Sequence, residues 1–364
     1  TLLEVALQMF ITDAYGRPFR SIRLLVTNEC NYNCFFCHME GSPAGRPFRI
    51  GEDPPSMTPL DYEILAEAAV SLGVRGFKIT GGEPLARSDI VEVVSAVSSP
   101  DRSLDISMTT NGFYLASLAP SLASAGLKRV NVSLHSLRRE VYRKITGVDG
   151  LDRVLEGLRV AVDMGLKVKI NTLVLRGINE TEVWSIAELA SKLGATLQLI
   201  ELIPVGRGSS LDKFAFKLSV IEEELLKRGA ERELRDLHYR PVYRLPNGVT
   251  VEIVSSPSNP VFCAGCDRVR VDPHGYVSPC INWSGRRVNI LDAIRSAKTR
   301  EEAVAATRLK LLEAVWLRRP GYMFTLAERR AVAREGRSLT RLSLPSRAKD
   351  LEKLGVSESS LLED

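Results

Sequence analysis

Six cysteines of this chain stand in two groups of three, at spacings that suit metal chemistry. Three thiolates in a short loop leave a tetrahedral metal site one ligand short, so each group raises the question of what completes it. In a reducing compartment, metal or catalytic chemistry is favoured over disulfides for such thiols. The first group, in the stretch NECNYNCFFCHMEG, is Cys30, Cys34 and Cys37, and the second is Cys263, Cys266 and Cys280.

Zinc and an iron–sulfur cluster both remain open for the first group. A structural zinc ion needs a fourth ligand, and His38, adjacent to Cys37, is poorly placed to join its neighbour on one tetrahedron. Three thiolates can instead hold a four-iron, four-sulfur cluster by three irons, which leaves the fourth iron open to another molecule. The spacing therefore favours the cluster without excluding zinc.

The elements that must position these cysteines alternate between strand and helix from Ser21 to Leu202. Apolar, β-branched runs predict strands buried on both faces at residues 21–27, 74–80, 104–110, 129–135, 167–175 and 196–203. Periodic stretches predict helices at 58–73, 88–99, 115–126, 151–165 and 180–194, several of them ending in glycine. The alternation predicts an α/β fold with a partial (βα)6 barrel of the TIM type over residues 1–203.

Polar residues gather where these predicted strands end. TGGEP (Thr80 to Pro84) follows the second strand, TTNG (Thr109 to Gly112) closes the third, and SLHS (Ser133 to Ser136) closes the fourth. Barrels of parallel strands place their active sites at the carboxyl ends of the strands. We therefore expect one active mouth that includes the first cysteine group.

We predict that residues 204–324 form a second module, of the α+β class. Residues 325–364 are predicted to form a charged helical tail of unknown role. In the module, Asp272 to Gly275 reads as a turn between DRVRV and YVSPC. The resulting hairpin would bring Cys280 back beside Cys263 and Cys266.

Composition excludes several classes of protein. Of 364 residues 45% are hydrophobic and 26% charged, no run of 18 apolar residues occurs, and the first residues do not resemble a signal peptide. The net charge of +5 comes from interleaved acidic and basic residues. These features predict a cytoplasmic protein that binds neither membrane nor nucleic acid.

The chain resembles the radical S-adenosylmethionine (SAM) superfamily in two features. The first cysteine group follows the first strand, and a Gly-Gly-Glu-Pro motif follows the second. The resemblance implies one [4Fe-4S] cluster whose open iron binds SAM, and a 5′-deoxyadenosyl radical formed by reductive cleavage of SAM. It also implies that SAM is bound by Phe36, Gly81, Gly82, Glu83, Thr110 and Ser133.

The second cysteine group resembles that of the GTP 3′,8-cyclase family of molybdenum cofactor biosynthesis, over roughly Arg17 to Phe324. The resemblance implies a second [4Fe-4S] cluster that meets the guanine of GTP, and conversion of GTP to (8S)-3′,8-cyclo-7,8-dihydro-GTP. It further implies an external one-electron reductant, a downstream cyclic pyranopterin monophosphate synthase and a homodimer.

Cations for a triphosphate stand where this family has them, and the resemblance implies GTP binding by Arg23, Lys78, Lys169, Arg268 and Arg270. Residues two apart on a strand face the same way, so Arg268 and Arg270 can act on one ligand. The chain departs from the family at Gln198, where many members have arginine, and at its acidic end, where the family has Gly-Gly. One cation is therefore missing from strand six or is supplied from elsewhere.

Other classes of function remain open at this point. A radical SAM enzyme that modifies a peptide or tRNA could share the first cysteine group and carry an auxiliary cluster, although this chain has no spare cysteine. An electron-transfer protein would use closed four-cysteine clusters, and a zinc scaffold would not need Gly-Gly-Glu-Pro at a strand end. Products formed from SAM and GTP would discriminate among these classes.

Overall fold

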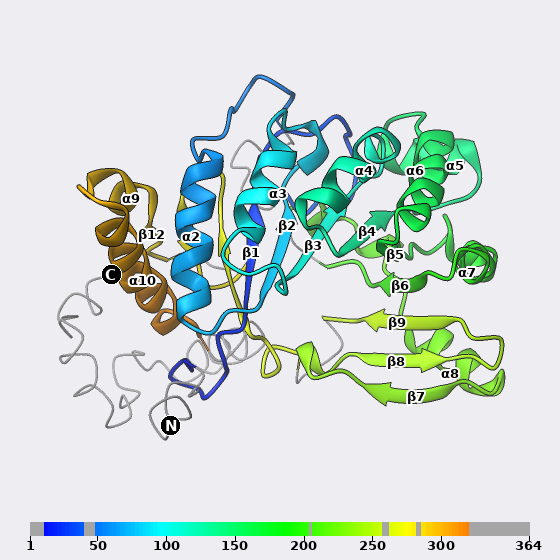
Figure 1. Ribbon diagram of the computed structural model, residues 1–364. Helices are drawn as coiled ribbons and strands as arrows, with labels where there is room; N and C mark the ends of the chain where they lie inside the picture. The colour runs from blue at the N-terminus through cyan, green and yellow to red at the C-terminus, as the bar shows by residue number, and fades with distance from the viewer. Residues whose placement is uncertain (1–10, 40–47, 204–205, 257–261, 282–284, 320–364) are drawn as a thin grey trace.

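The computed structural model describes residues 11–39, 48–203, 206–256, 262–281 and 285–319. These residues fold around one mixed sheet in the order β12-β11-β10-β1-β2-β3-β4-β5-β6-β9-β8-β7. Helices line one side of the central strands, while β7, β8 and β9 extend the sheet at one end (Figure 1). The predicted α/β class is confirmed, and the sheet stays an open, partial barrel with β12 and β7 as its edges.

Six parallel strands form the centre of the sheet in chain order, each paired with the next. They begin and end within a few residues of the predicted positions. Parallel pairing with helical crossovers buries both sides of the strands, which explains their apolar runs. The strands are β1 (Ser21–Leu25), β2 (Gly76–Thr80), β3 (Asp105–Thr110), β4 (Arg129–Ser133), β5 (Lys167–Leu173) and β6 (Thr196–Ile200).

The five helices predicted between these strands are present. Thr58 and Asp61 start the first of them with a capping box, in which the Thr58 amide donates to the Asp61 carboxylate at 2.8 Å. Gly126, with φ of 115°, ends another in the left-handed conformation that glycine adopts without strain. The helices are α2 (Pro59–Ser71), α3 (Ile90–Ser98), α4 (Leu115–Ala125), α6 (Leu151–Asp163) and α7 (Val183–Lys192), with short 3-10 turns η1 (Pro84–Ala86) and η2 (Glu180–Glu182).

The two faces of the central sheet differ in chemistry. Side chains toward the helices are apolar and fully buried, as at Ile22, Ile106 and Leu199; burying one such side chain contributes about 1.5–3 kcal/mol. The alternate positions on the other face are polar or charged, including Ser107, Asn131, Asn171 and Gln198, and these are buried as well. The strands are thus buried on both faces, as predicted, but only one face is an apolar core.

Residues after 203 add strands to both edges of this same sheet. On one side β9 (Thr250–Val254) pairs in parallel with β6 and leads to β8 (Pro241–Arg244) and β7 (Glu231–Leu234). On the other, β10 (Arg268–Val271) pairs in parallel with β1 and continues to β11 (Tyr276–Ser278) and β12 (Val288–Asn289). Because the sheet is shared, a domain boundary at residue 203 stays a prediction. The connecting helices are α8 (Ser219–Lys227), η3 (Gly206–Ser210), η4 (Asp212–Phe214) and η5 (Leu237–Tyr239).

Two C-terminal helices, α9 (Leu291–Ser296) and α10 (Arg300–Trp316), pack beside α2 (Figure 1). Arg300 binds Glu63 and Glu67 of α2, each at 2.8 Å. The sequence did not predict α5 (Arg139–Thr146), a short charged helix. The predicted tail at 325–364 lies outside the described residues. Within the described ranges no helix is both long and apolar enough to cross a membrane.

Candidate active site

The first cysteine group lies in the loop that follows β1, and backbone hydrogen bonds fix this loop on two sides. The Cys30 amide donates to the Phe48 carbonyl at 2.8 Å, and the Phe35 amide donates to Ile145 of α5 at 3.2 Å. All three cysteines are half-buried, and none of the six cysteines, which are all described, forms a disulfide. Cys30 also lines a cavity of about 450 Å³. Three half-buried thiols on one fixed loop fit a group held by three ligands.

The surroundings do not by themselves stabilise three thiolates. Burial, with a contribution from Glu83, raises the pKa of Cys30 to about 12, and burial raises the pKa of Cys34 as well. At Cys37 burial acts in the same direction, but a hydrogen bond and charge from His38 lower the pKa overall. Thiolates are the metal-binding form of cysteine. The positive charge of iron in a bound cluster would therefore supply the stabilisation of the thiolates that the protein groups do not provide.

The Gly-Gly-Glu-Pro motif packs directly against the cysteine loop. The Gly82 amide donates to the Thr27 carbonyl at 2.7 Å, and the Glu83 amide donates to the Glu29 carbonyl at 2.8 Å. A Cβ atom would come within 2.4 Å of Thr27 O at Gly81 and within 2.1 Å of Glu29 O at Gly82. Only glycine allows this approach, and the motif thus joins the carboxyl ends of β1 and β2.

Glu83 and Thr110, both predicted to bind SAM, bind each other. The buried Glu83 carboxylate accepts hydrogen bonds from Thr110 Oγ1 at 2.5 Å, the Asn111 amide at 2.6 Å and the Leu85 amide at 3.0 Å. Burial raises the pKa of Glu83 to about 7, although the hydrogen bonds act in the opposite direction. Asn111 Nδ2 in turn donates to Asn31 of the cysteine loop at 2.8 Å. These contacts tie β2 and β3 to the loop that carries the thiols.

Phe36, in the cysteine loop, packs against the residues that follow β4. Its ring meets the His135 ring edge-on, with centroids 4.9 Å apart. Burial lowers the pKa of His135 to about 4, so the imidazole is neutral, and its Nδ1 accepts from the Leu173 amide at 3.2 Å. Ser133 is half-buried and lies opposite Asn171 in the β4–β5 register. Phe36 and Ser133, both predicted to bind SAM, therefore lie near the carboxyl end of β4.

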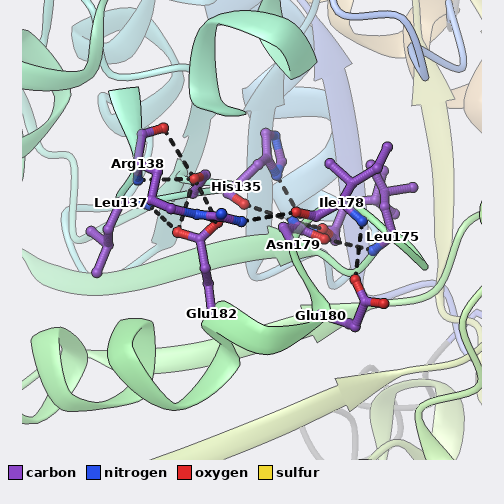
Figure 2. Close-up of polar contacts among 10 residues, drawn as sticks. His135, Leu137, Arg138, Leu175, Ile178, Asn179, Glu180 and Glu182 are labelled. Carbon is purple, nitrogen blue, oxygen red and sulfur yellow. Dashed lines mark hydrogen bonds and ion pairs between the residues drawn. The ribbon is translucent and has the colours of Figure 1, made fainter. Parts of the chain in front are cut away.

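Two polar residues that belong to none of the predicted sites, Asn179 and Glu182, hold the segment after β4 in place by hydrogen bonds (Figure 2). Asn179 Nδ2 donates to the carbonyls of His135 and Leu173, at 2.6 and 2.8 Å. The Glu182 carboxylate accepts from the Leu137 amide at 2.8 Å and from Arg138 Nε at 3.0 Å. The two side chains join the loops after β4 and β5, so SLHS is held by buried hydrogen bonds.

The second cysteine group flanks the predicted β10–β11 hairpin, which is confirmed. The register pairs Arg270 with Ser278; Cys266 precedes β10 by two residues and Cys280 follows β11 by two residues, while the approach of Cys280 to Cys263 and Cys266 stays a prediction. Among the described residues, which include both cysteine groups, no three His, Cys, Asp or Glu side chains are placed to hold a single metal ion. A four-iron cluster differs from a single ion because each cysteine binds a different iron.

Two arginines that belong to none of the predicted sites form hydrogen bonds to the loop between Cys263 and Cys266. Arg17 Nη1 donates to the Cys263 carbonyl at 3.1 Å, and Arg318 Nη2 donates to the Cys266 carbonyl. Asp13 is fully buried and pairs with both arginines, at 2.7 Å to Arg17 Nε and 3.3 Å to Arg318 Nη1. We call Asp13, Arg17 and Arg318 the loop clamp; it connects both ends of the described chain to the second cysteine group.

The predicted GTP-binding cations share the polar face of the sheet. Arg23 lies between Arg270 of β10 and Lys78 of β2 in one register row. Burial lowers the pKa of Lys78 well below its usual value, and the charges of Arg23 and Lys169 lower it further. The structure therefore brings cations from β1, β2, β5 and β10 into one cluster, which runs from the second cysteine group toward β5.

A carboxylate that belongs to none of the predicted sites lies at the far end of this cluster. Glu252 of β9 forms ion pairs with Lys169, with Arg235 at 2.8 Å and with Arg240 at 2.9 Å. These charges overcome burial and hold the pKa of Glu252 at about 2. A glutamate in the middle of the apolar run VTVEIV was the signal that could have identified it.

Comparisons with known proteins agree with this geometry. Residues 24–190 match the Radical SAM superfamily, and residues 195–324 match the Molybdenum Cofactor Synthesis C family. The chain is 46% identical to the "Probable GTP 3′,8-cyclase" of Aeropyrum pernix over 342 residues, which are 93% of this chain and 95% of that protein. It is 43% identical to the protein of that name from Thermococcus kodakarensis, over 80% of this chain and 94% of that protein.

Solved structures share the fold at low sequence identity. Streptococcus suis SuiB bound to S-adenosylmethionine has a TM-score of 0.58 at 15% identity, and the match covers 79% of this chain and 66% of SuiB. Native anSMEcpe with bound AdoMet has a TM-score of 0.53 at 16% identity, with coverage of 74% and 77%. Taken with the sequence matches over nearly the whole chain, these findings show that the protein belongs to the GTP 3′,8-cyclase family of the radical SAM superfamily.

Proposed function

We propose that this protein converts GTP to (8S)-3′,8-cyclo-7,8-dihydro-GTP, the first step of molybdenum cofactor biosynthesis. One observation carries the proposal: a cluster of cations on the polar sheet face connects the second cysteine group with the strands whose ends hold the first. A nucleotide triphosphate suits such a cluster, since its phosphates need several cations and its base can extend toward the hairpin.

In this proposal the two cysteine groups hold two clusters with different tasks. Cys30, Cys34 and Cys37 hold the [4Fe-4S] cluster that binds SAM, beside Phe36 and Ser133 and beneath the Gly81 to Glu83 loop. That cluster and SAM supply a 5′-deoxyadenosyl radical when an external reductant gives one electron. Cys263, Cys266 and Cys280 would hold the second [4Fe-4S] cluster, which would supply an open iron as a ligand for the guanine.

The residues of the chain act by binding and positioning. Arg268 and Arg270 follow the second cysteine group on β10 and hold the base end, while Arg23, Lys78 and Lys169 bind the triphosphate. Glu83 and Thr110 act on SAM through the loop that they fix, because their side chains are occupied by each other. Fixing both reactants this way places the ribose C3′ hydrogen near the radical, and much of the rate enhancement comes from this proximity.

The reaction balances as an isomerisation of GTP. One electron divides SAM into methionine and a 5′-deoxyadenosyl radical, which takes the C3′ hydrogen atom and becomes 5′-deoxyadenosine. A bond then forms between C3′ and C8, and a second electron and a proton complete the dihydropurine. Each turnover therefore uses two electrons from the reductant and one SAM.

Anaerobic reconstitution with iron and sulfide, followed by SAM, dithionite and GTP, tests the proposal. We expect 5′-deoxyadenosine together with a cyclic isomer of GTP, which has the mass of GTP and is distinguished from it by chromatographic retention and fragmentation in tandem mass spectrometry. 5′-Deoxyadenosine without any GTP-derived product would overturn the cyclase assignment and indicate a radical SAM enzyme for another substrate, such as a peptide or tRNA.

A further inference from the structure

The ion pairs around Glu252 carry more positive charge than one carboxylate neutralises. The Glu252 side chain is only 2% exposed, yet Lys169, Arg235 and Arg240 all pair with it. Arg235 is 33% exposed, but Lys169 and Arg240 are 16% and 12% exposed and are one buried cation more than Glu252 neutralises; because burying unbalanced charge is costly, this surplus is hard to explain by stability alone. A surplus of this kind is what an anionic ligand would neutralise.

These cations come from separate parts of the chain and meet on the polar face of the sheet. Lys169 is on β5 and Glu252 on β9, whereas Arg240 precedes β8, which pairs with β9. The neighbouring positions Ile170 and Ile253 are fully buried on the opposite, apolar face. The side chains around Glu252 therefore lie on the face that carries the predicted GTP-binding cations.

Arg240 is held in a defined place but keeps hydrogen-bonding capacity. Its Nη2 lies 2.9 Å from Glu252 Oε1, and its Nη1 donates to Gln198 Oε1 at 3.4 Å. Its Nε is buried and has no hydrogen-bond partner within the described part of the chain. The side chain is 12% exposed, so the guanidinium is not sealed off. A fork of donors with one edge unused suits a phosphate group.

Gln198 is the β6 residue beside Arg240, and it carries no positive charge of its own. Gln198 stands on β6 between Asn171 of β5 and Glu252 of β9 in one register row. It is uncharged, and its amide donates to Asn171 Oδ1 at 3.0 Å. The guanidinium of Arg240 lies against this amide and so supplies the positive charge that β6 itself lacks.

Electrostatic coupling links this corner to the rest of the cation cluster. Arg268 is among the charges that act on Arg240, and Lys169 is among those that act on Lys78. The positive charge of Arg240 therefore also acts on a ligand that is bound by Lys78 and Lys169. Several adjacent cations favour a chain of phosphates over a single carboxylate.

We propose that Arg240, anchored by Glu252 and Gln198, is a further binding residue for the polyphosphate of the nucleotide substrate. This inference rests on the proposed function, since it assigns part of the GTP site to a residue that neither sequence pattern nor predicted site included. Arg240 acts beside Lys169 and replaces a cation on β6.

Equilibrium binding to the reconstituted protein without reductant tests the inference, because no turnover then intervenes. We expect Arg240→Gln to weaken binding of GTP and of inorganic triphosphate by roughly 10- to 100-fold, the range for one lost charge-assisted hydrogen bond. Binding of guanosine, which lacks phosphate, stays unchanged. Arg244→Gln, an exposed arginine of β8 that pairs with Glu233, is the matched control and leaves all three ligands unaffected.

A charge swap separates binding from folding. Gln198→Arg combined with Arg240→Gln returns a guanidinium to the same corner from β6, and we expect it to recover at least part of the triphosphate affinity. Unchanged GTP and triphosphate affinity in a folded Arg240→Gln protein would overturn the inference, as would an equal loss for guanosine. If the unaltered protein binds no GTP at all, the proposed function fails instead.

Discussion

The hydroxyl of Thr110 donates a hydrogen bond of 2.5 Å to the buried carboxylate of Glu83, so two residues expected to face SAM face each other. The pair joins the ends of β2 and β3 directly beneath the cysteine loop. The Gly-Gly-Glu-Pro motif is therefore a structural joint as well as part of the proposed SAM site, and each of its residues can be tested separately.

Replacing Glu83 by glutamine should lower stability and SAM binding together. The glutamine amide nitrogen would face an N–H or O–H donor where the carboxylate accepts three hydrogen bonds. We expect a loss of about 1–3 kcal/mol in the free energy of unfolding, measured by chemical denaturation. Glu92→Gln on the exposed side of α3 should change nothing. A Glu83→Gln protein as stable as the unaltered one would contradict this role.

An alanine at Gly82 should displace the cysteine loop, because its Cβ would lie 2.1 Å from the Glu29 carbonyl oxygen. We expect reconstituted Gly82→Ala to lose the spectroscopic change that SAM causes in the first cluster. Gly76→Ala, at the start of the β2 strand that precedes Gly82, is the control, since a Cβ atom there would have the Ser21 side chain as its nearest neighbour, at 3.4 Å. An undisturbed SAM response in Gly82→Ala would show that the close approach is dispensable.

Nucleotide binding should weaken as pH rises past about 8. Burial lowers the pKa of Lys169 to about 8, with Glu252 opposing and Arg235 and Arg240 adding to the shift. Because deprotonation removes a cation, GTP affinity should fall between pH 7 and 9, while Lys169→Arg should bind GTP with little change over that range. Calorimetric titration at several pH values measures this, and parallel pH profiles for both proteins would refute it.

The loop clamp should matter for the second cysteine group and not for the first. Asp13→Asn leaves Arg17 and Arg318 buried without their shared carboxylate, and breaking such a buried pair costs about 3–5 kcal/mol. We expect a chelator to remove iron from the second site faster, while SAM cleavage persists. Asp101→Asn, a partly exposed position between α3 and β3, is the control. Equal iron loss from both sites would indicate general unfolding rather than a local effect.

Cys280→Ser should separate the two proposed clusters. We expect it to retain reductive SAM cleavage and to lose most cyclic product, because Cys280 lies beside the hairpin that carries Arg268 and Arg270. The ratio of 5′-deoxyadenosine to cyclic product measures the effect. A proportional loss of both products would argue against divided roles.

Much of the fold was predictable because each central strand is an apolar run bounded by helices with clear ends. The short helix α5, REVYRKIT, was missed because its charged residues hide the apolar face that Tyr142 and Ile145 bury. The cysteine and glycine motifs were visible as local patterns. Arg240, Glu252 and the loop clamp were not, because the pairs Lys169–Glu252 and Asp13–Arg318 join residues that are far apart in the sequence and that only the folded chain brings together.

The central claim is that hydrogen leaves C3′ of GTP, and isotope transfer measures this most directly. GTP deuterated at C3′ should give 5′-deoxyadenosine that carries the deuterium, together with a cyclic isomer that has lost it. Unlabelled 5′-deoxyadenosine formed at the same rate with and without GTP would contradict the account.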